Sequence, residues 1–414
     1  MPARINRSAG GLAADVALYG ISAVFASITA LTSTLLPHRA WGSIAAWAYV
    51  AAFLVTGTQL LLRRPIFRTA LTWAAWAGVA LLPLMVQAVQ RADGRTDRAQ
   101  EEVLVVEHMG QRLAETGTPY LGPEAIGALP PGEQLLGYAP YQPGMAAFGL
   151  PRAAFGDAWW TDARIWFALV TAAALVTAVR LLRSHPVRAV QFATVLPICA
   201  LTVATGGDDL PVLALSLLAL ACCATVRFTA AGLAIGAAAA LKLFALPVLA
   251  VLLVLAYTTG NLRRFAPFAL GVPLIALLPA AVDSDAFVEN VIRFPLGHGI
   301  VTSPAQSPFP GYLITQAVPG GRYVAAGLLV AAGLAIAVLL IRRPPRTAAT
   351  AALFCGYGLL AAILLMPTTR FGYLLYPLAL LVWAHALRSP SAVGGAPAAG
   401  GASAVGGATP ARGS

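Results

Sequence analysis

Long apolar runs recur along nearly the whole chain, separated by short stretches that carry prolines, glycines and arginines. Most runs contain about 17 to 23 residues, enough for a helix to cross a hydrocarbon core of roughly 30 Å. They are apolar on every face, which predicts helices and excludes the alternating strands of a transmembrane β-barrel. About twelve runs occur, beginning near residues 14, 42, 69, 163, 187, 210, 229, 243, 264, 322, 347 and 371. The predicted fold class is therefore all-α, a polytopic membrane helix bundle.

Composition supports this prediction. Of the 414 residues, 59% are hydrophobic and only 10% are charged, and the mean hydropathy is +0.77. A soluble single-domain enzyme of this size is excluded, because it could not cover its surface with so few polar residues. The four cysteines all lie inside apolar runs, so neither a disulfide framework nor a zinc site is expected.

The charged residues predict an orientation in the membrane. The net charge is +11, and the arginines cluster at the ends of apolar runs, as in Arg63-Arg64, Arg263-Arg264 and Arg342-Arg343. This distribution is typical of cytoplasmic loops and removes any need to invoke nucleic acid. It predicts a multi-pass membrane protein with both termini in the cytoplasm.

The acidic residues are grouped on the opposite side. Of the 16 acids, all but Asp15 fall in the segments 91–162, 208–209 and 283–289, which this orientation places outside. Acids could simply collect where basic residues are disfavoured. That explanation does not account for the length of the first segment, about seventy residues in a chain whose other loops are short.

Three regions follow along the chain. Residues 1–68 carry two N-terminal spans, residues 69–388 form a transmembrane core with the outer loop 91–162, and residues 389–414 are rich in Gly, Ala, Ser and Pro. The last region is predicted to be a disordered cytoplasmic tail. Within the core, residues 229–258 are expected to form two short helices that meet near Lys242 at the outer surface, because a single span would invert every arginine-bearing loop downstream.

Glu102 is the candidate general base. Residues 99–115 predict an amphipathic helix on which Glu102, Val106, Met109 and Leu113 share one stripe. A carboxylate held against apolar surface becomes a better proton acceptor. A capping or salt-bridging glutamate is the commoner explanation of such a pattern.

Lys242, Arg370 and Arg293 are the candidate phosphate-binding residues. Lys242 is the only lysine of the chain and lies within an apolar stretch. An intramembrane lysine costs roughly 2.5 to 3.5 kcal/mol on insertion scales and is a functional candidate for that reason. Snorkelling of its side chain to the interface is an equally weighted alternative.

Six further residues are candidates for sugar or acceptor binding. Tyrosines interleaved with prolines on the outer side form an aromatic shelf that can stack on a sugar ring or lie at the headgroup level. Outer acids can bind hydroxyl groups or a metal ion, although near helix ends they are more often caps. The six are Tyr120, Tyr138, Tyr141, Asp208, Asp209 and His298.

The order of these motifs resembles integral-membrane glycosyltransferases of the GT-C type, and most closely glycosyltransferase family 87 of actinobacteria. That family's first outer loop contains an acid, a short helix, a Gly-x-Pro-Tyr string and a Tyr/Pro-rich string. Here these correspond to Glu102, the helix, Gly117-Thr-Pro119-Tyr120 and Tyr138-Ala-Pro140-Tyr141. Further similar strings begin at Gly206, Lys242, Phe294 and Ser303, so the resemblance covers residues 69–388. The family usually has aspartate where this chain has Glu102, and it lacks the two N-terminal spans.

The resemblance implies an inverting transfer of a hexose, with mannose expected, from a polyprenyl-phosphate sugar to a glycolipid or cell-envelope glycan on the outer face. It places this transfer at the plasma membrane, with Glu102 as base and no required cofactor, although a divalent metal stays open. If Glu102 is not the base, Asp208, Asp209 and Glu107 are the next candidates. The alternative is a transporter or flippase of a lipid-linked sugar, which should show two related halves that this sequence lacks. A purely structural subunit is a third possibility.

Overall fold

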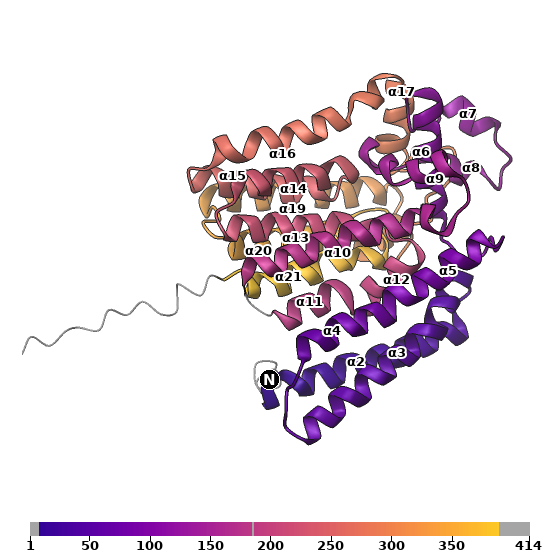
Figure 1. Ribbon diagram of the computed structural model, residues 1–414. Coiled ribbons are helices and arrows are strands. Elements are labelled where there is room, and N and C mark those ends of the chain that lie inside the picture. The colour runs from indigo at the N-terminus through magenta and orange to yellow at the C-terminus, as the bar shows by residue number, and fades with distance from the viewer. Residues whose placement is uncertain (1–7, 184–185, 389–414) are drawn as a thin grey trace, which may run out of the picture.

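The computed structural model describes residues 8–183 and 186–388. Within these residues the chain is helical throughout and contains no strand, apart from one isolated bridge between Gln306 and Thr369. The predicted all-α class is confirmed (Figure 1). The predicted tail, residues 389–414, lies outside the described residues, as do residues 1–7.

Every predicted apolar run coincides with a helix or with consecutive helices. The bundle consists of α2 (Leu12–Thr32), α3 (Leu36–Leu61), α4 (Arg68–Trp76), η2 (Ala77–Leu81), α5 (Leu82–Ala92), α10 (Ala163–Leu182), α11 (Val187–Thr194), α12 (Pro197–Thr205), α13 (Asp209–Ala224), α14 (Phe228–Leu241), α15 (Ala245–Thr258), α16 (Leu262–Ala276), α18 (Pro310–Ala317), α19 (Gly321–Arg342), α20 (Ala348–Leu365), η7 (Phe371–Leu374) and α21 (Leu375–Ala386).

Six of these helices, counting α4–η2–α5 as one, are long and apolar enough to cross a membrane unaided. A seventh results if α11 and α12 are one bent span. Four shorter apolar helices, Asp209–Ala224, Phe228–Leu241, Ala245–Thr258 and Phe371–Ala386, account for four more of the predicted runs. Helix α16 corresponds to the twelfth. The number of crossings therefore stays a prediction.

Two breaks in the helices shape the interior. The first lies before Pro197, which lacks an N–H to continue α11, and the axes of α11 and α12 differ by 43°. The second lies at Lys242, which ends α14 in an extended conformation before α15 begins at Ala245. Residues 229–258 thus form two short helices, as the sequence predicts.

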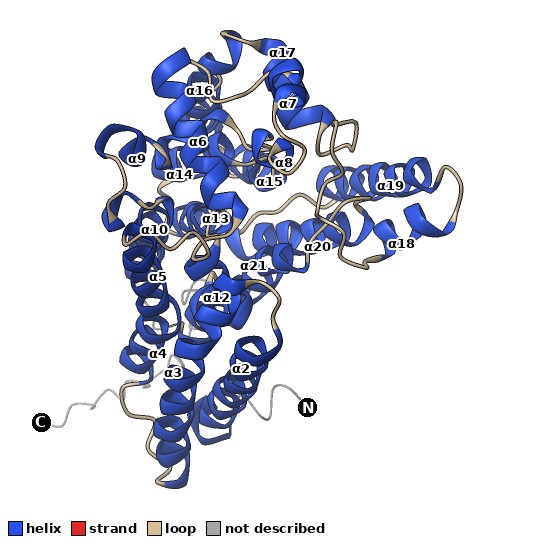
Figure 2. Cartoon of the chain, turned by 90° about the vertical axis from the view of Figure 1, so that its right-hand side faces the viewer, coloured by secondary structure: helices blue, strands red, loops and turns tan. Residues whose placement is uncertain are grey.

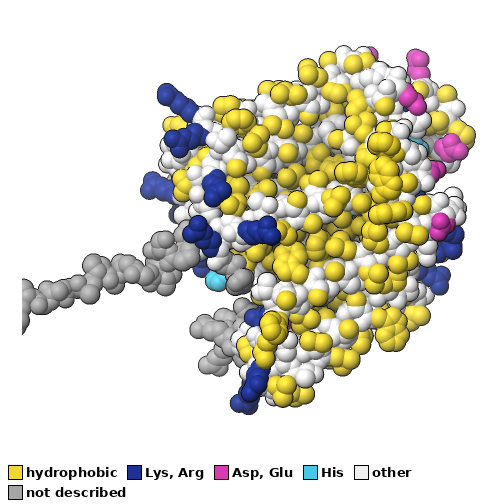
Figure 3. All heavy atoms as spheres, in the orientation of Figure 1, with side chains coloured by type: hydrophobic (Ala, Val, Ile, Leu, Met, Phe, Trp, Pro, Cys, Tyr) yellow, Lys and Arg dark blue, Asp and Glu magenta, His cyan; other side chains and the backbone are white. Residues whose placement is uncertain are grey.

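The acidic segments gather at one end of the bundle. The outer loop folds into α6 (Glu101–Thr116), α7 (Pro123–Ala128), α8 (Gln134–Gly137), η3 (Pro143–Phe148), α9 (Leu150–Phe155) and η4 (Trp159–Thr161). Helices α6 to α9 lie at the same end of the bundle as α17 (Ser284–Phe287) (Figure 1). The connection after α16 contains η5 (Leu278–Ala281) and η6 (Val288–Arg293). Figure 3 shows most Asp and Glu side chains at this end, most Lys and Arg side chains at the other, and apolar surface between them. This separation agrees with the charge pattern of the sequence.

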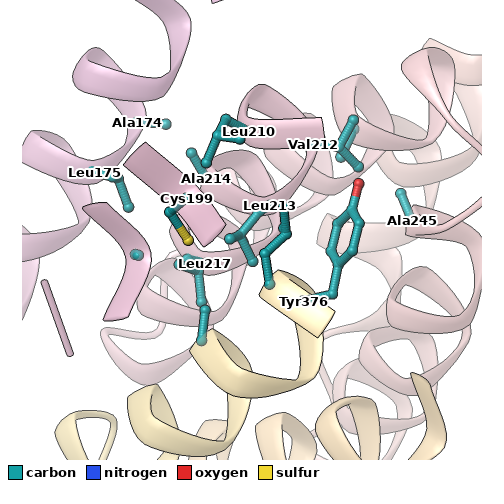
Figure 4. Close-up of a cluster of buried hydrophobic side chains, with 14 of the residues drawn as sticks. Ala174, Leu175, Cys199, Leu210, Val212, Leu213, Ala214, Leu217, Ala245 and Tyr376 are labelled. Carbon is teal, nitrogen blue, oxygen red and sulfur yellow. The ribbon is translucent and has the colours of Figure 1, made fainter. Parts of the chain in front are cut away.

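The core is centred on α13, which is buried along nearly its whole length. Leu210, Leu213 and Leu217 of α13 pack among residues of α10, α12 and α21 (Figure 4). Close approach of backbones replaces bulky packing between α14 and α16. A Cβ atom on Gly232 would lie 2.4 Å from the carbonyl oxygen of Phe265, so only glycine permits this contact. Small residues at interfaces are the usual means of packing helices in lipid.

The two N-terminal helices form a hairpin that packs against α4 and α12 (Figure 2). Asp15 of α2 pairs with Arg68 at 2.7 Å and with Arg188 at 2.8 Å. The hydroxyl of Tyr49 donates to the carbonyl oxygen of Val195 at 2.5 Å, in a buried position. Hence the hairpin is fixed to the core by buried polar contacts.

A buried ion-pair network holds the outer loop onto the bundle. Arg91 of α5 makes two bonds to Glu107 of α6, at 2.7 and 2.5 Å. It also contacts Asp162, which pairs with the fully buried Arg164 at 2.7 Å. Burial alone would raise the pKa of Asp162, but the two arginines hold the pKa of this carboxyl well below its usual range. The network joins the beginning and the end of the outer loop.

We expect Asp162→Asn to destabilise the protein strongly, by about 3 to 5 kcal/mol, because it leaves Arg91 and Arg164 buried with less compensating charge. Asp157→Asn is the matched control. The side chain of Asp157 is 75% exposed, so its loss should cost less than about 1 kcal/mol. Thermal unfolding in detergent measures both variants, and equal melting temperatures would contradict a structural role for the network.

Candidate functional site

A cavity of about 930 Å³ lies between the outer-loop elements and the bundle. Its walls come from α2, the start of α3, α6, the α12–α13 turn, the α14–α15 break and the turn between α20 and η7. One part of the wall carries carboxylates and cations, and another part is apolar, with Phe25, Ile28, Leu201 and Leu378 among its residues. An amphiphilic molecule matches such a lining.

Lys242 lies in the charged part of this cavity, between two aspartates. Its Nζ is 2.7 Å from Oδ2 of Asp208 and 2.6 Å from Oδ1 of Asp209. Only 7% of the residue is exposed. The break after α14 brings the lysine into the interior, and the Gly206-Gly207 turn brings the aspartates to the start of α13. The side chain therefore does not snorkel to the interface.

Aromatic residues surround this cluster. The Lys242 ammonium lies 5.2 Å from the ring centroid of Tyr141 and 5.4 Å from that of Tyr373, distances suited to cation–π attraction. The hydroxyl of Tyr376 donates to Oδ1 of Asp209 at 2.7 Å. Phe244 stacks on Tyr376 at 5.2 Å between centroids. These contacts join α13, α15 and α21 around one buried charge cluster.

Glu102 and Arg370 form a second ion pair in the same cavity, between Oε1 and Nη1. Both side chains are only partly buried, with 18% of Glu102 and 36% of Arg370 exposed. Glu102 stands in the first turn of α6, beside the buried Val103, Val106 and Met109. Its carboxylate is thus salt-bridged, the commoner of the two explanations of the sequence pattern, yet it stays accessible to a ligand, as a proton acceptor must be.

Tyr138 closes one side of the cavity. Its ring stacks on Phe294 with centroids 4.1 Å apart, and both residues line the cavity. Its hydroxyl donates to Glu289 at 3.0 Å and accepts from the backbone N–H of Ile300 at 2.7 Å. The backbone N–H of Ala139, the next residue, donates to Oδ1 of Asn290 at 2.7 Å. The outer loop and residues 289–300 are thus joined by three hydrogen bonds and a stacked ring pair.

The charged side chains that line the cavity determine which ligand groups it can bind. Four carboxylates, those of Glu101, Glu102, Asp208 and Asp209, face two cations, Lys242 and Arg370. An ammonium carries three N–H donors and Lys242 uses two on the aspartates, so one remains for a ligand. Arg370 keeps several unused donors. Among the described residues no group of three or more His, Cys, Asp or Glu side chains has the arrangement of a metal site.

The structure brings together most of the residues that the sequence singled out. Glu102, Tyr138, Tyr141, Asp208, Asp209, Lys242 and Arg370 all line the cavity. Three candidates do not line it. Tyr120 is buried and donates to the carbonyl oxygen of Tyr141, Arg293 is exposed and pairs with Glu289, and His298 is exposed. These three residues lie outside the cavity as the structure has it, and their contacts with substrate stay a prediction.

Other lining residues gave no signal in the sequence. His38 and Gln100 reach the polar part of the cavity, yet neither belongs to a recognisable string. Tyr373 lines the cavity, and Tyr376 lies behind it on Asp209. Both follow Arg370 in the chain and could have been found as an aromatic pair beside a basic residue. The ion pairs of Lys242 and Arg370 join residues 33, 34 and 268 positions apart, which spacing alone cannot reveal.

The fold and this site define a polytopic membrane protein with a charged and partly apolar cavity at its acidic end. The sequence model of glycosyltransferase family 87 matches residues 138–367. The chain belongs to this family, and the resemblance that its motifs suggest is confirmed.

Two solved structures are similar to the chain. The crystal structure of ArnT from Cupriavidus metallidurans bound to undecaprenyl phosphate has a TM-score of 0.46 and 17% identity, over 75% of this chain and 59% of that one. The same protein in the apo state has a TM-score of 0.42 and 17% identity, over 77% and 59%. The chain thus spans less than two thirds of the ArnT length. No curated protein matches the chain significantly.

We expect Lys242→Met to destabilise the protein by about 3 to 5 kcal/mol, because it leaves Asp208 and Asp209 buried without their counter-charge. Arg293→Met is the control: this side chain is 60% exposed and pairs with Glu289 along one helical turn, so its loss should cost less than about 1 kcal/mol. Thermal unfolding of both variants in the same detergent is the measurement. A Lys242→Met protein as stable as Arg293→Met would show that the cluster is not structural.

Proposed function

We propose that the protein transfers a hexose, with mannose as the first candidate, from a polyprenyl-phosphate sugar to a hydroxyl group of a glycolipid or cell-envelope glycan. Family 87 membership supports sugar transfer. The lipid-linked donor and the acceptor hydroxyl are supported by one observation: a partly exposed carboxylate, two cations and an apolar wall line the same cavity. A lipid-linked sugar phosphate offers the matching anionic head, hydroxyl groups and apolar chain.

In the proposed reaction Glu102 is the general base. Its carboxylate takes the proton of the acceptor hydroxyl as the oxygen attacks the anomeric carbon. The bond between that carbon and the phosphate oxygen breaks, and its electron pair leaves with the polyprenyl phosphate. Attack opposite the leaving group inverts the anomeric centre. Arg370 holds the Glu102 carboxylate in place through their ion pair.

The leaving phosphate is proposed to bind at Arg370 and Lys242. Arg370 has N–H donors to spare beside its bond to Glu102, and Lys242 has one. Charge develops on the phosphate as it leaves, so donors fixed beforehand stabilise the transition state more than the ground state. Tyr138 and Tyr141 offer ring faces to the sugar, and Asp208 and Asp209 accept hydrogen bonds from its hydroxyl groups.

The cavity is proposed to open on the outer face of the plasma membrane. It lies at the acidic end of the bundle, and most arginines lie at the other end (Figure 3). Basic residues favour the cytoplasmic side. A polyprenyl-phosphate donor suits the outer face, because transfer from it requires no nucleotide outside the cell.

We expect Glu102→Gln to lower sugar transfer by about 100-fold or more, the usual contribution of a general base. The measurement is transfer of radiolabelled sugar from polyprenyl-phosphate mannose to a membrane glycolipid extract by the purified protein in lipid. Glu115→Gln is the control, since Glu115 is an exposed residue of the same helix α6 and should leave transfer unchanged.

Each other outcome has a definite meaning. Transfer that survives Glu102→Gln would contradict Glu102 as the base and move the role to Asp208 or Asp209. A wild-type protein that transfers no sugar from any lipid-linked donor offered, but moves the lipid across the bilayer, would contradict the proposed function in favour of a flippase.

We expect transfer to persist in EDTA within about twofold, without an added cofactor. The two aspartates that would best suit a divalent ion already enclose the Lys242 ammonium, which offsets part of their negative charge and occupies the place between them. Transfer assays with EDTA alone and with EDTA plus excess Mg²⁺ or Mn²⁺ measure this. Loss of transfer in EDTA that the metal restores would contradict it.

A further inference from the structure

The N-terminal hairpin contributes directly to the cavity. Phe25, Ile28, Thr29 and Thr32 of α2 line one wall, and His38 near the start of α3 lines the charged part. These residues precede the family match, which begins at Tyr138. The cavity therefore combines residues inside the match with a wall from outside it.

His38 has an unusual position for a polar side chain. Its Nε2 is buried and has no hydrogen-bond partner among the described residues, although unpaired buried polar atoms cost about 1 to 3 kcal/mol. The imidazole lies beside the side chains of Gln100 and Glu102. The imidazole also lines the cavity, so a ligand bound there would lie beside it.

The apolar wall lies on the same hairpin. Phe25 and Ile28 of α2 face Ile198 and Leu201 of α12 and Leu378 of α21 across one continuous cavity. Phe25 and Ile28 are about half exposed, at 46% and 54%, whereas Leu31 is 78% exposed and does not line the cavity. Helix α2 thus presents different residues to the cavity and to the surrounding lipid.

The hairpin is fixed in position rather than loosely attached. The indole N–H of Trp41 donates to the carbonyl oxygen of Val79 at 2.8 Å, and the Tyr49 hydroxyl donates to Val195 at 2.5 Å. Both bonds are buried, and Asp15 secures the opposite end through Arg68 and Arg188. A wall held in this way can keep a binding group in a fixed place.

We propose that the α2–α3 hairpin is part of the donor site, with α2 lining the path of the prenyl chain and His38 donating or accepting a hydrogen bond at the sugar-phosphate head. This inference rests on the proposed lipid-linked donor. It makes His38 a binding residue supplied by a segment outside the family match.

The test is binding of a long-chain polyprenyl phosphate and of short-chain geranyl phosphate to the full-length protein in detergent, which requires no sugar transfer. Ile28→Trp narrows the apolar part of the cavity. It should weaken binding of the long-chain lipid by about tenfold, but of the short-chain lipid by less than about twofold. Leu31→Trp is the matched control, an equal change three residues away on the exposed face, and should leave both affinities unchanged.

His38 is tested with a pair of variants. His38→Phe keeps the approximate volume and removes the polar atoms, and it should weaken binding of both lipids by about tenfold. His38→Gln keeps a hydrogen-bonding group and should recover most of the affinity. Thermal unfolding of every variant separates loss of binding from loss of folding.

Several outcomes would overturn the inference. The inference fails if Ile28→Trp and Leu31→Trp have equal effects on binding, or if Ile28→Trp weakens binding of the long and the short lipid equally. It also fails if His38→Phe binds both lipids with full affinity. Each of these results would remove the hairpin from the donor site and leave the glycosyltransferase proposal unchanged. In a sugar-transfer assay, variants that change only the KM of the acceptor would likewise remove the hairpin from the donor site. A wild-type protein that binds no polyprenyl phosphate would overturn both the inference and the proposed donor.

Discussion

The pairing of Lys242 with Asp208 and Asp209 is the constraint on which the interior of this protein depends. A lone ammonium inside an apolar bundle is costly, and so are two carboxylates without a cation. The three groups satisfy one another only where α14 stops early and the α12–α13 turn approaches it. Tyr376 then ties α21 to the same cluster. One set of charges therefore determines the helix break, the turn and the position of the C-terminal helix that enclose the cavity.

A second set of buried charges performs the corresponding task for the outer loop. Glu107 and Asp162 lie near the two ends of that loop, and Arg91 bonds to both. With the loop held in this way, Glu102, five residues before Glu107 on α6, has a defined place beside Arg370. Burial thus separates the roles of the acids. The fully buried carboxylates stabilise the structure, and the partly exposed Glu102 is available for chemistry.

Much of the fold follows from the sequence because apolar length decides where a helix can cross a membrane. The helix that carries Glu102 was also predictable from local residue types, and the break at Lys242 from the charge of the loops that follow it. The break before Pro197 divides a run that the sequence predicted as one span. The partners of the charges were not. Lys242 and the aspartates were expected to bind phosphate and hydroxyl groups separately, and the structure pairs them. The place of His38 beside Glu102 depends on how a hairpin packs against helices far away in the sequence, and no local pattern contains that information.

The central claim is that the cavity holds the head of a lipid-linked donor between Arg370 and Lys242. The most direct measurement is a cryo-electron microscopy structure of the full-length protein in a lipid nanodisc with a polyprenyl phosphate bound. The account predicts phosphate density in contact with Arg370 and Lys242, and a prenyl chain that leaves along α2. Lipid density confined to the outside of the bundle, with both ion pairs intact and the cavity empty, would contradict it.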